Sequence, residues 1–150
     1  MLSLNNTRPY VLYIEDDVED VELLKYTLTE TPFAFDIVHM SNGPEALDFL
    51  EHSKLYNRFP EVIFLDVNLP KMDGKEILLC LKADKDIARI PLTILSTSNH
   101  EADVRYFHDF RIPYITKPGD VNKFKDDVVE VMKGLLAFDY DFSVSRRNTA

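Results

Sequence analysis

Short apolar runs alternate with amphipathic stretches along the whole chain. Five runs of mainly β-branched or aromatic residues, at 10–14, 35–38, 62–65, 92–95 and 114–115, predict buried strands. Between them, apolar residues recur every three or four positions, which predicts helices. The helical stripes are Val18, Val21, Leu24 and Leu28; Ala46, Leu47 and Leu50 after Pro44; Ile77, Leu78 and Leu81; Val104 and Phe107; and Val121, Phe124, Val128, Val131 and Leu135.

This alternation predicts an α/β fold in which a five-stranded parallel sheet carries helices on both faces. At this size we expect the flavodoxin-like strand order 2-1-3-4-5. We divide the chain into an N-terminal extension (1–9), one domain (10–137) and a tail (138–150). In the tail, apolar residues alternate with polar ones, which fits either a frayed end or an arm that packs on its own domain or on a second subunit.

Composition narrows the class of protein. The 150 residues include 17 Lys and Arg against 26 Asp and Glu, a formal net charge of -9. So acidic a chain is a poor binder of nucleic acid or of anionic membrane, so we expect neither as a partner. The single cysteine, Cys80, cannot form an intramolecular disulfide and is expected to be buried. With no apolar run long enough to span a membrane and no visible signal peptide, the sequence predicts a cytoplasmic protein.

Polar side chains follow four of the five predicted strands. Glu15, Asp16 and Asp17 follow the first, Asp66 the third, Ser96 and Thr97 the fourth, and Thr116 and Lys117 the fifth. The carboxyl ends of parallel strands meet at one edge of the sheet, so we expect these groups to converge. Carboxylates suit Mg²⁺, an Asp can accept a phosphoryl group, and a Lys can bind phosphate oxygens. For Asp17, a simple helix N-cap is an equal alternative.

Four segments together resemble the receiver domain of bacterial response regulators: 13–17, 65–74, 94–97 and 114–118. The resemblance covers about residues 10–136, and the stretch 51–61 is similar to the small receivers that partner bacterial phytochromes. The family often carries Gly-Ala before the fifth strand, where this chain has Phe110-Arg111-Ile112-Pro113. The geometry of that loop therefore stays open.

The resemblance also implies roles for individual residues. Asp66 would be the phosphoacceptor, and Mg²⁺ would be bound by Asp16, by Glu15 acting through water, by Asp66 and by the backbone carbonyl of Asn68. Ser96 would be the switch hydroxyl, with Thr97 beside it, and Lys117 would bind a phosphoryl oxygen. Tyr114 would be an aromatic that either changes rotamer or simply fills the core. Pro118 would follow a peptide bond that is commonly cis in the family.

We therefore predict a stand-alone response regulator, not an enzyme beyond its own phosphorylation and dephosphorylation. A sensor histidine kinase or a histidine phosphotransfer protein would phosphorylate it, and the output would be binding to a downstream protein or a homodimer. One alternative is a pseudo-receiver that binds partners without phosphorylation. Another, a haloacid-dehalogenase-type phosphatase, typically needs a second Asp where this chain has Asn68. A flavodoxin would need hydroxyls, not acids, after the first strand.

Overall fold

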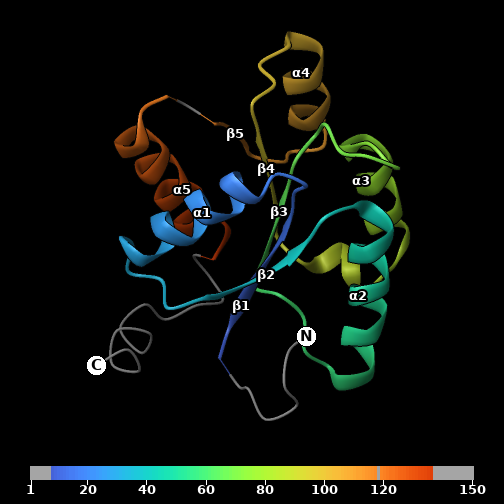
Figure 1. Ribbon diagram of the computed structural model, residues 1–150. Coiled ribbons are helices and arrows are strands. Elements are labelled where there is room, and N and C mark those ends of the chain that lie inside the picture. Colours follow the sequence, from blue (N-terminus) through green and yellow to red (C-terminus); the bar gives the residue numbers. More distant parts are fainter. Residues whose placement is uncertain (1–7, 118, 137–150) are drawn as a thin grey trace.

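The computed structural model describes residues 8–117 and 119–136, in which five parallel strands form a single sheet (Figure 1). The strands are β1 (Tyr10–Ile14), β2 (Asp36–Met40), β3 (Val62–Leu65), β4 (Leu92–Ser96) and β5 (Tyr114–Thr116). Their order is β2-β1-β3-β4-β5, which confirms the predicted fold class. β2 runs two residues further than predicted, because Met40 still pairs with Ile14 at the end of β1.

In the described residues, four α-helices connect the strands and a fifth follows β5, each close to a predicted stripe. They are α1 (Val18–Thr29), α2 (Gly43–Tyr56), α3 (Gly74–Ala83), α4 (Glu101–Asp109) and α5 (Val121–Leu135), with a short 3₁₀ helix, η1 (Ile87–Arg89), that the sequence did not predict. Four of the α-helices begin at a side chain that accepts a backbone N–H of the first turn, as an N-cap does. These caps are Asp17, Asn42, Asp73 and Asp120.

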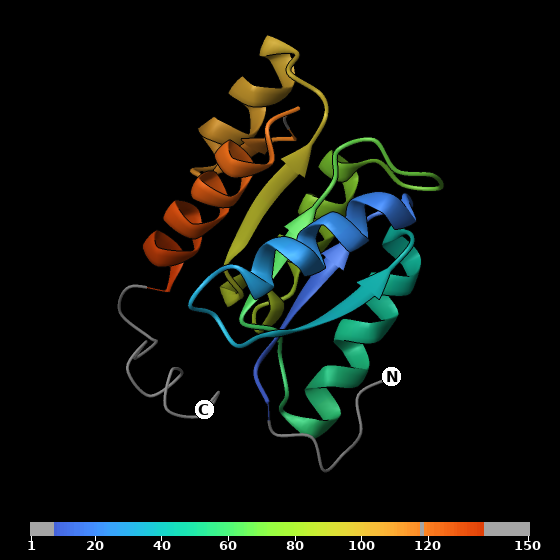
Figure 2. The ribbon, with the colours of Figure 1, turned by 60° about the vertical axis from the view of Figure 1, so that its left-hand side comes forward.

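The helices form two layers, one on each face of the sheet. α1 packs beside α5 on one face, and α2 packs beside α3 on the other (Figure 1). In the turned view, α1 lies in front of the strands and α3 behind them (Figure 2). Alternate residues of β1 point into the two cores: Leu12 and Ile14 into that of α2 and α3, Val11 and Tyr13 into that of α1 and α5.

Some predicted core positions are exposed. Val18 and Val121 are 65% and 47% exposed, because each is the first residue of its helix and lies at the end of the packed face. Val104 is 36% exposed on α4, where Phe107 is the buried member of the stripe. The prediction that Cys80 is buried is wrong: it is exposed, because it lies outside the stripe of Ile77, Leu78 and Leu81 on α3.

The loop before β5, where the sequence departs from the family pattern, has a defined geometry in the structure. Arg111 adopts a left-handed conformation, with φ of 59°. Its N–H donates to the carbonyl of His108 at 2.8 Å, and the N–H of Ile112 donates to the carbonyl of Phe107 at 3.0 Å. These two hydrogen bonds terminate α4. They hold Arg111 in a backbone conformation that glycine adopts more easily than arginine.

The start of α3 presses against the loop that follows β3. The N–H of Gly74 donates to the carbonyl of Val67 at 2.8 Å. A Cβ atom at position 74 would lie 2.8 Å from both the carbonyl oxygen of Asp66 and the Cα atom of Val67. Both neighbours are backbone atoms of a buried segment, so they cannot swing aside as a side chain would. Gly74 therefore fixes how closely α3 approaches Asp66.

We expect Gly74→Ala to lower the free energy of unfolding by about 1–3 kcal/mol, because the added methyl overpacks the Asp66 backbone. Gly134→Ala is the matched control: outside its own helix, no atom of the described residues lies within 4 Å of its Cβ position. In the interior of α5, that change should stabilise the protein by about 0.5–1 kcal/mol. Urea unfolding of both variants measures the difference, and equal effects would contradict the packing described for α3.

Candidate functional site

The strand register brings three acidic residues to one edge of the sheet. Ile14 at the end of β1 lies opposite Leu65 at the end of β3. The N–H of Asp66 donates to the carbonyl of Ile14 at 3.1 Å, and the N–H of Glu15 donates to the carbonyl of Met40 at 3.0 Å. Glu15 and Asp66 are thus the first residues beyond adjacent strands, and backbone hydrogen bonds hold both in place.

The carboxylates of Glu15, Asp16 and Asp66 form a cluster in which one oxygen from each lies within 4.8 Å of the others. Glu15 and Asp66 are buried, whereas Asp16 is exposed. Within the described residues, no side chain or backbone group donates a hydrogen bond to the Asp66 carboxylate. A buried carboxylate without a donor is costly unless a cation or another ligand compensates it. The donor set, three carboxylates, is the kind that hard divalent cations prefer.

Lys117 is the cation that the fold itself brings to this edge. Its Nζ atom lies 2.6 Å from Glu15 Oε2 and 2.8 Å from Asp20 Oδ2, and its side chain is only 6% exposed. Burial works to lower the pKa of the ammonium group, but hydrogen bonds to Asp20 and Glu15 and the charge of Asp66 outweigh it and raise the pKa. Lys117 therefore stays charged while buried, and its two partners in the described part of the chain are Glu15 and Asp20, not Asp66.

Glu15 is the most constrained member of the cluster. Its Oε1 accepts the N–H of Asp17 at 3.1 Å, and its Oε2 accepts the hydroxyl of Tyr13 at 3.5 Å as well as Lys117. Its backbone carbonyl lies 2.5 Å from Nε2 of His39, which must donate because a carbonyl can only accept. Burial raises the pKa of Glu15 to about 7, with a further increase from the nearby charge of Asp66, against the opposing effect of Lys117.

Ser96 and Tyr114 meet at the loop that follows β4. Ser96 is fully buried, and its Oγ accepts the N–H of Ser98 at 3.2 Å. The hydroxyl of Tyr114 donates to the carbonyl of Ser98 at 2.6 Å. The predicted switch hydroxyl and the predicted switch aromatic are therefore joined through the backbone of one residue, Ser98.

A second network holds the same loop from outside. Ser98 Oγ donates to Asp103 Oδ2 at 2.9 Å, and Lys75 Nζ lies 2.9 Å from Asp103 Oδ1. Lys75 also lies 5.0 Å from the ring centroid of Tyr106, within the range of a cation–π interaction. This ion pair connects α3 to α4 across the end of β4.

The predicted roles of Thr97 and of the Asn68 backbone carbonyl stay predictions. Both residues are exposed, and within the described segments their side chains make no hydrogen bond or ion pair with the cluster. Asp17 is the N-cap of α1, which confirms the N-cap alternative for this residue. The prediction of a cis bond before Pro118 and the predictions for the tail fall outside the described residues.

Three contributors were missed by the sequence analysis: Asp20 on Lys117, Tyr13 beneath Glu15, and Asp103 on Ser98. Asp20 carried the one usable signal, since it lies at the start of the predicted helix that directly follows the acidic run 15–17. Tyr13 and Asp103 gave none, because a strand aromatic and a first-turn acid both have ordinary structural explanations.

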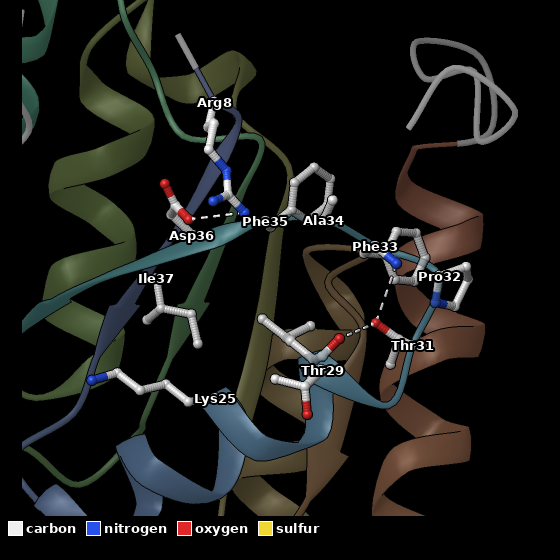
Figure 3. A pocket seen from close by; sticks show the side chains of 11 residues that line it. Arg8, Lys25, Thr29, Thr31, Pro32, Phe33, Ala34, Phe35, Asp36 and Ile37 are labelled. Atoms are coloured by element: carbon white, nitrogen blue, oxygen red, sulfur yellow. Dashed lines mark hydrogen bonds and ion pairs between the residues drawn. The ribbon is translucent and has the colours of Figure 1, made fainter. Parts of the chain in front are cut away.

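A separate pocket lies at the amino end of β2, away from these residues (Figure 3). It has a volume of about 540 Å³ and is lined by the loop after α1 together with Arg8, Lys25 and Asp36. Arg8 and Asp36 form an ion pair at 3.3 Å across it. None of the predicted site residues lines this pocket.

The parallel sheet, the acid cluster and the buried lysine at one edge define the class of proteins that handle a phosphoryl group on an aspartate. Within that class, residues 11–129 match the family model described as "Response regulator receiver domain". The chain belongs to this family of two-component signalling proteins. The flavodoxin and phosphatase alternatives are not supported.

Similar proteins include response regulators connected with phytochromes. The chain is 30% identical to "Response regulator Rcp1" of Synechocystis over 137 residues, which cover 89% of this chain and 90% of that protein. It is similar to the crystal structure of the phosphorylated cyanobacterial phytochrome response regulator RcpA (TM-score 0.75, 30% identity, 89% and 98% coverage). The Mn²⁺-bound form of Rcp1 gives a TM-score of 0.73 at 30% identity, with 88% and 97% coverage. In the parts of this chain that the structure describes, no helix is both long and apolar enough to cross a membrane.

The ion pair of Asp103 predicts a dependence of stability on pH. The hydrogen bond from Lys75 lowers the pKa of Asp103 below its ordinary value of 3.8. A lowered pKa stabilises the fold above pH 3.8, and this contribution is lost as the pH falls through 3.8 and below. We expect Asp103→Asn to cost about 0.5 kcal/mol at pH 7, as expected for a partly exposed pair, and to cost nothing once wild-type Asp103 is protonated.

Urea unfolding between pH 7 and pH 2.5 measures this difference. Asp126→Asn, an exposed acid on α5 with no ion pair in the described segments, is the matched control and should leave stability unchanged throughout. A deficit of the Asp103→Asn protein that does not shrink as the pH falls below 3.8 would contradict the proposed ion pair.

Proposed function

We propose that Asp66 accepts a phosphoryl group from a phosphohistidine of a sensor histidine kinase or a histidine phosphotransfer protein, with Mg²⁺ as the cofactor. The observation that carries this proposal is the Asp66 carboxylate: it is buried, lacks a hydrogen-bond donor in the described residues, and lies in a cluster with Glu15 and Asp16. Such a carboxylate can bind a cation and can attack an electrophile.

In the proposed reaction, a carboxylate oxygen of Asp66 attacks the phosphorus atom. The P–N bond of the phosphohistidine breaks, and its electron pair stays on the imidazole nitrogen. When bound by Asp16, Glu15, Asp66 and the Asn68 carbonyl, Mg²⁺ would neutralise charge on the cluster and the phosphoryl oxygens. Lys117 would bind a phosphoryl oxygen as a point charge, and catalysis would rest on positioning and electrostatics.

The phosphorylated site would signal through the loop after β4. Ser96, with Thr97 beside it, would turn towards the phosphoryl group, and the hydrogen bond of Tyr114 to the Ser98 carbonyl would couple that shift to β5. The surface of α4, β5 and α5 would then bind a downstream protein or a second copy of the chain. We further infer a receiver domain spanning 10–137, located in the cytoplasm and without catalytic activity beyond its own phosphorylation and dephosphorylation.

Phosphorylation is tested by intact mass after incubation with a small phosphodonor such as acetyl phosphate. We expect one phosphoryl adduct that requires Mg²⁺ and is absent from Asp66→Ala. Asp73→Asn is a control, since Asp73 follows the same strand but caps α3. A folded wild-type protein that binds Mg²⁺ yet forms no adduct would favour the pseudo-receiver alternative.

Metal binding is tested by the shift of the melting temperature with added Mg²⁺. A ligand that binds only the folded state stabilises it by RT ln(1 + [L]/Kd). We expect Asp16→Asn to remove most of the shift, because no group in the described residues engages the exposed Asp16 carboxylate, so the change removes a metal ligand and breaks no contact within the protein. The control is Glu19→Gln, an exposed acid in the first turn of α1. Equal shifts in the two variants would count against a metal site at this cluster.

A further inference from the structure

Asp20 contacts the one buried lysine of the site, although neither the strand-end pattern nor the family resemblance assigns it a role. It lies in the first turn of α1, and its Oδ2 accepts a hydrogen bond from Lys117 Nζ at 2.8 Å. The two residues are 97 positions apart in the sequence. Asp20 on α1 thus binds the side chain of Lys117, the residue that follows β5.

The hydrogen bonds of Lys117 determine what it can do next. An ammonium group has three donors. Glu15 Oε2 and Asp20 Oδ2 occupy two of them, while Asp66 forms no ion pair with Lys117 in the described part of the chain. Lys117 is therefore held towards β1 and α1 before any phosphoryl group is present. The third donor has no partner among the described residues, but the ammonium lies outside ion-pair distance of Asp66. Movement towards a phosphoryl group on Asp66 would therefore stretch at least one of these two bonds.

Of the two carboxylates, Asp20 can release Lys117 at the lower cost. The side chain of Glu15 is 2% exposed, so its oxygens would lose a partner that water cannot readily replace. The side chain of Asp20 is 25% exposed, so water can hydrate it when the lysine leaves. The difference in exposure makes the Asp20 bond the one that exchanges.

We propose that Asp20 is a positioning residue that retains Lys117 in the unphosphorylated protein, and that Lys117 moves from Asp20 to a phosphoryl oxygen when Asp66 is phosphorylated. This inference rests on the proposed function. It makes Asp20 a competitor of the phosphoryl group for the same ammonium. Asp20 thereby weakens the phosphorylated state and sets how strongly phosphorylation changes the position of Lys117.

The test uses beryllofluoride with Mg²⁺, an analogue of the aspartyl phosphate, and measures its apparent affinity by fluorine NMR. Asp20→Asn keeps the shape of the side chain but removes its charge. Loss of one charge-assisted hydrogen bond to the competitor should tighten the binding of the analogue about tenfold. Glu19→Gln, which removes a charge from the same helical turn, should change the affinity by less than about twofold, as expected for a solvated charge.

A double-mutant cycle separates competition for Lys117 from general charge repulsion. In a Lys117→Met background, Asp20→Asn should change the affinity by less than about twofold, because there is no ammonium left to release. A second readout, the NMR signal of the Lys117 side chain without the analogue, should shift in Asp20→Asn and stay unchanged in Glu19→Gln. If the Asn variant fails to fold, Asp20→Ser replaces it.

The inference is overturned if Asp20→Asn binds the analogue no better than wild type, or gains equally in both backgrounds. Failure of the proposed function gives a different result: wild type would not bind beryllofluoride in the presence of Mg²⁺, or Asp66→Ala would bind it equally well. Wild-type binding that depends on Asp66 but not on Asp20 would therefore remove this inference and leave the proposed function standing.

Discussion

The buried ion pairs of Lys117 are the interaction on which the rest of the site depends. They join the end of β5 to the end of β1 and to the first turn of α1, and they place one positive charge beside buried carboxylates that would otherwise repel one another. One ammonium cannot balance Glu15, Asp20 and Asp66 together with the exposed Asp16. The site therefore retains an excess of negative charge. This excess favours the binding of a divalent cation, and it repels a phosphoryl group when no cation is bound.

Parallel pairing is what turns residues distant in sequence into one site. Each strand ends at nearly the same level, so Glu15, Asp66 and Lys117 emerge together, and Gly74 allows α3 to approach the Asp66 backbone. At the end of β4, hydrogen bonds join Ser96 to Ser98, and Ser98 in turn to Tyr114 and Asp103. These short contacts join the loop after β4 to α4 and to β5.

The alternation of apolar runs with helical stripes was sufficient for the fold and its strand order, and the polar residues that end those runs predicted which carboxylates lie together with Lys117. The sequence could not supply the partner of Lys117 on α1: Asp20 is 97 residues away, and the contact depends on how α1 is oriented over the sheet. The exposure of Val18 and Cys80 was missed for a related reason, since a helical stripe does not state where the packed face ends. Nor does a pattern show that Arg111 takes a conformation suited to glycine, which the bonds closing α4 impose.

In the proposed function, the carboxylate of Asp66, and no other acid of the cluster, carries the phosphoryl group. Borohydride reduces an aspartyl phosphate to homoserine, so treatment of the phosphorylated protein followed by peptide mass mapping locates the modified residue. The account predicts homoserine at position 66 alone. Homoserine at Asp16 or elsewhere, or a phosphoryl adduct that borohydride leaves unreduced, would contradict it.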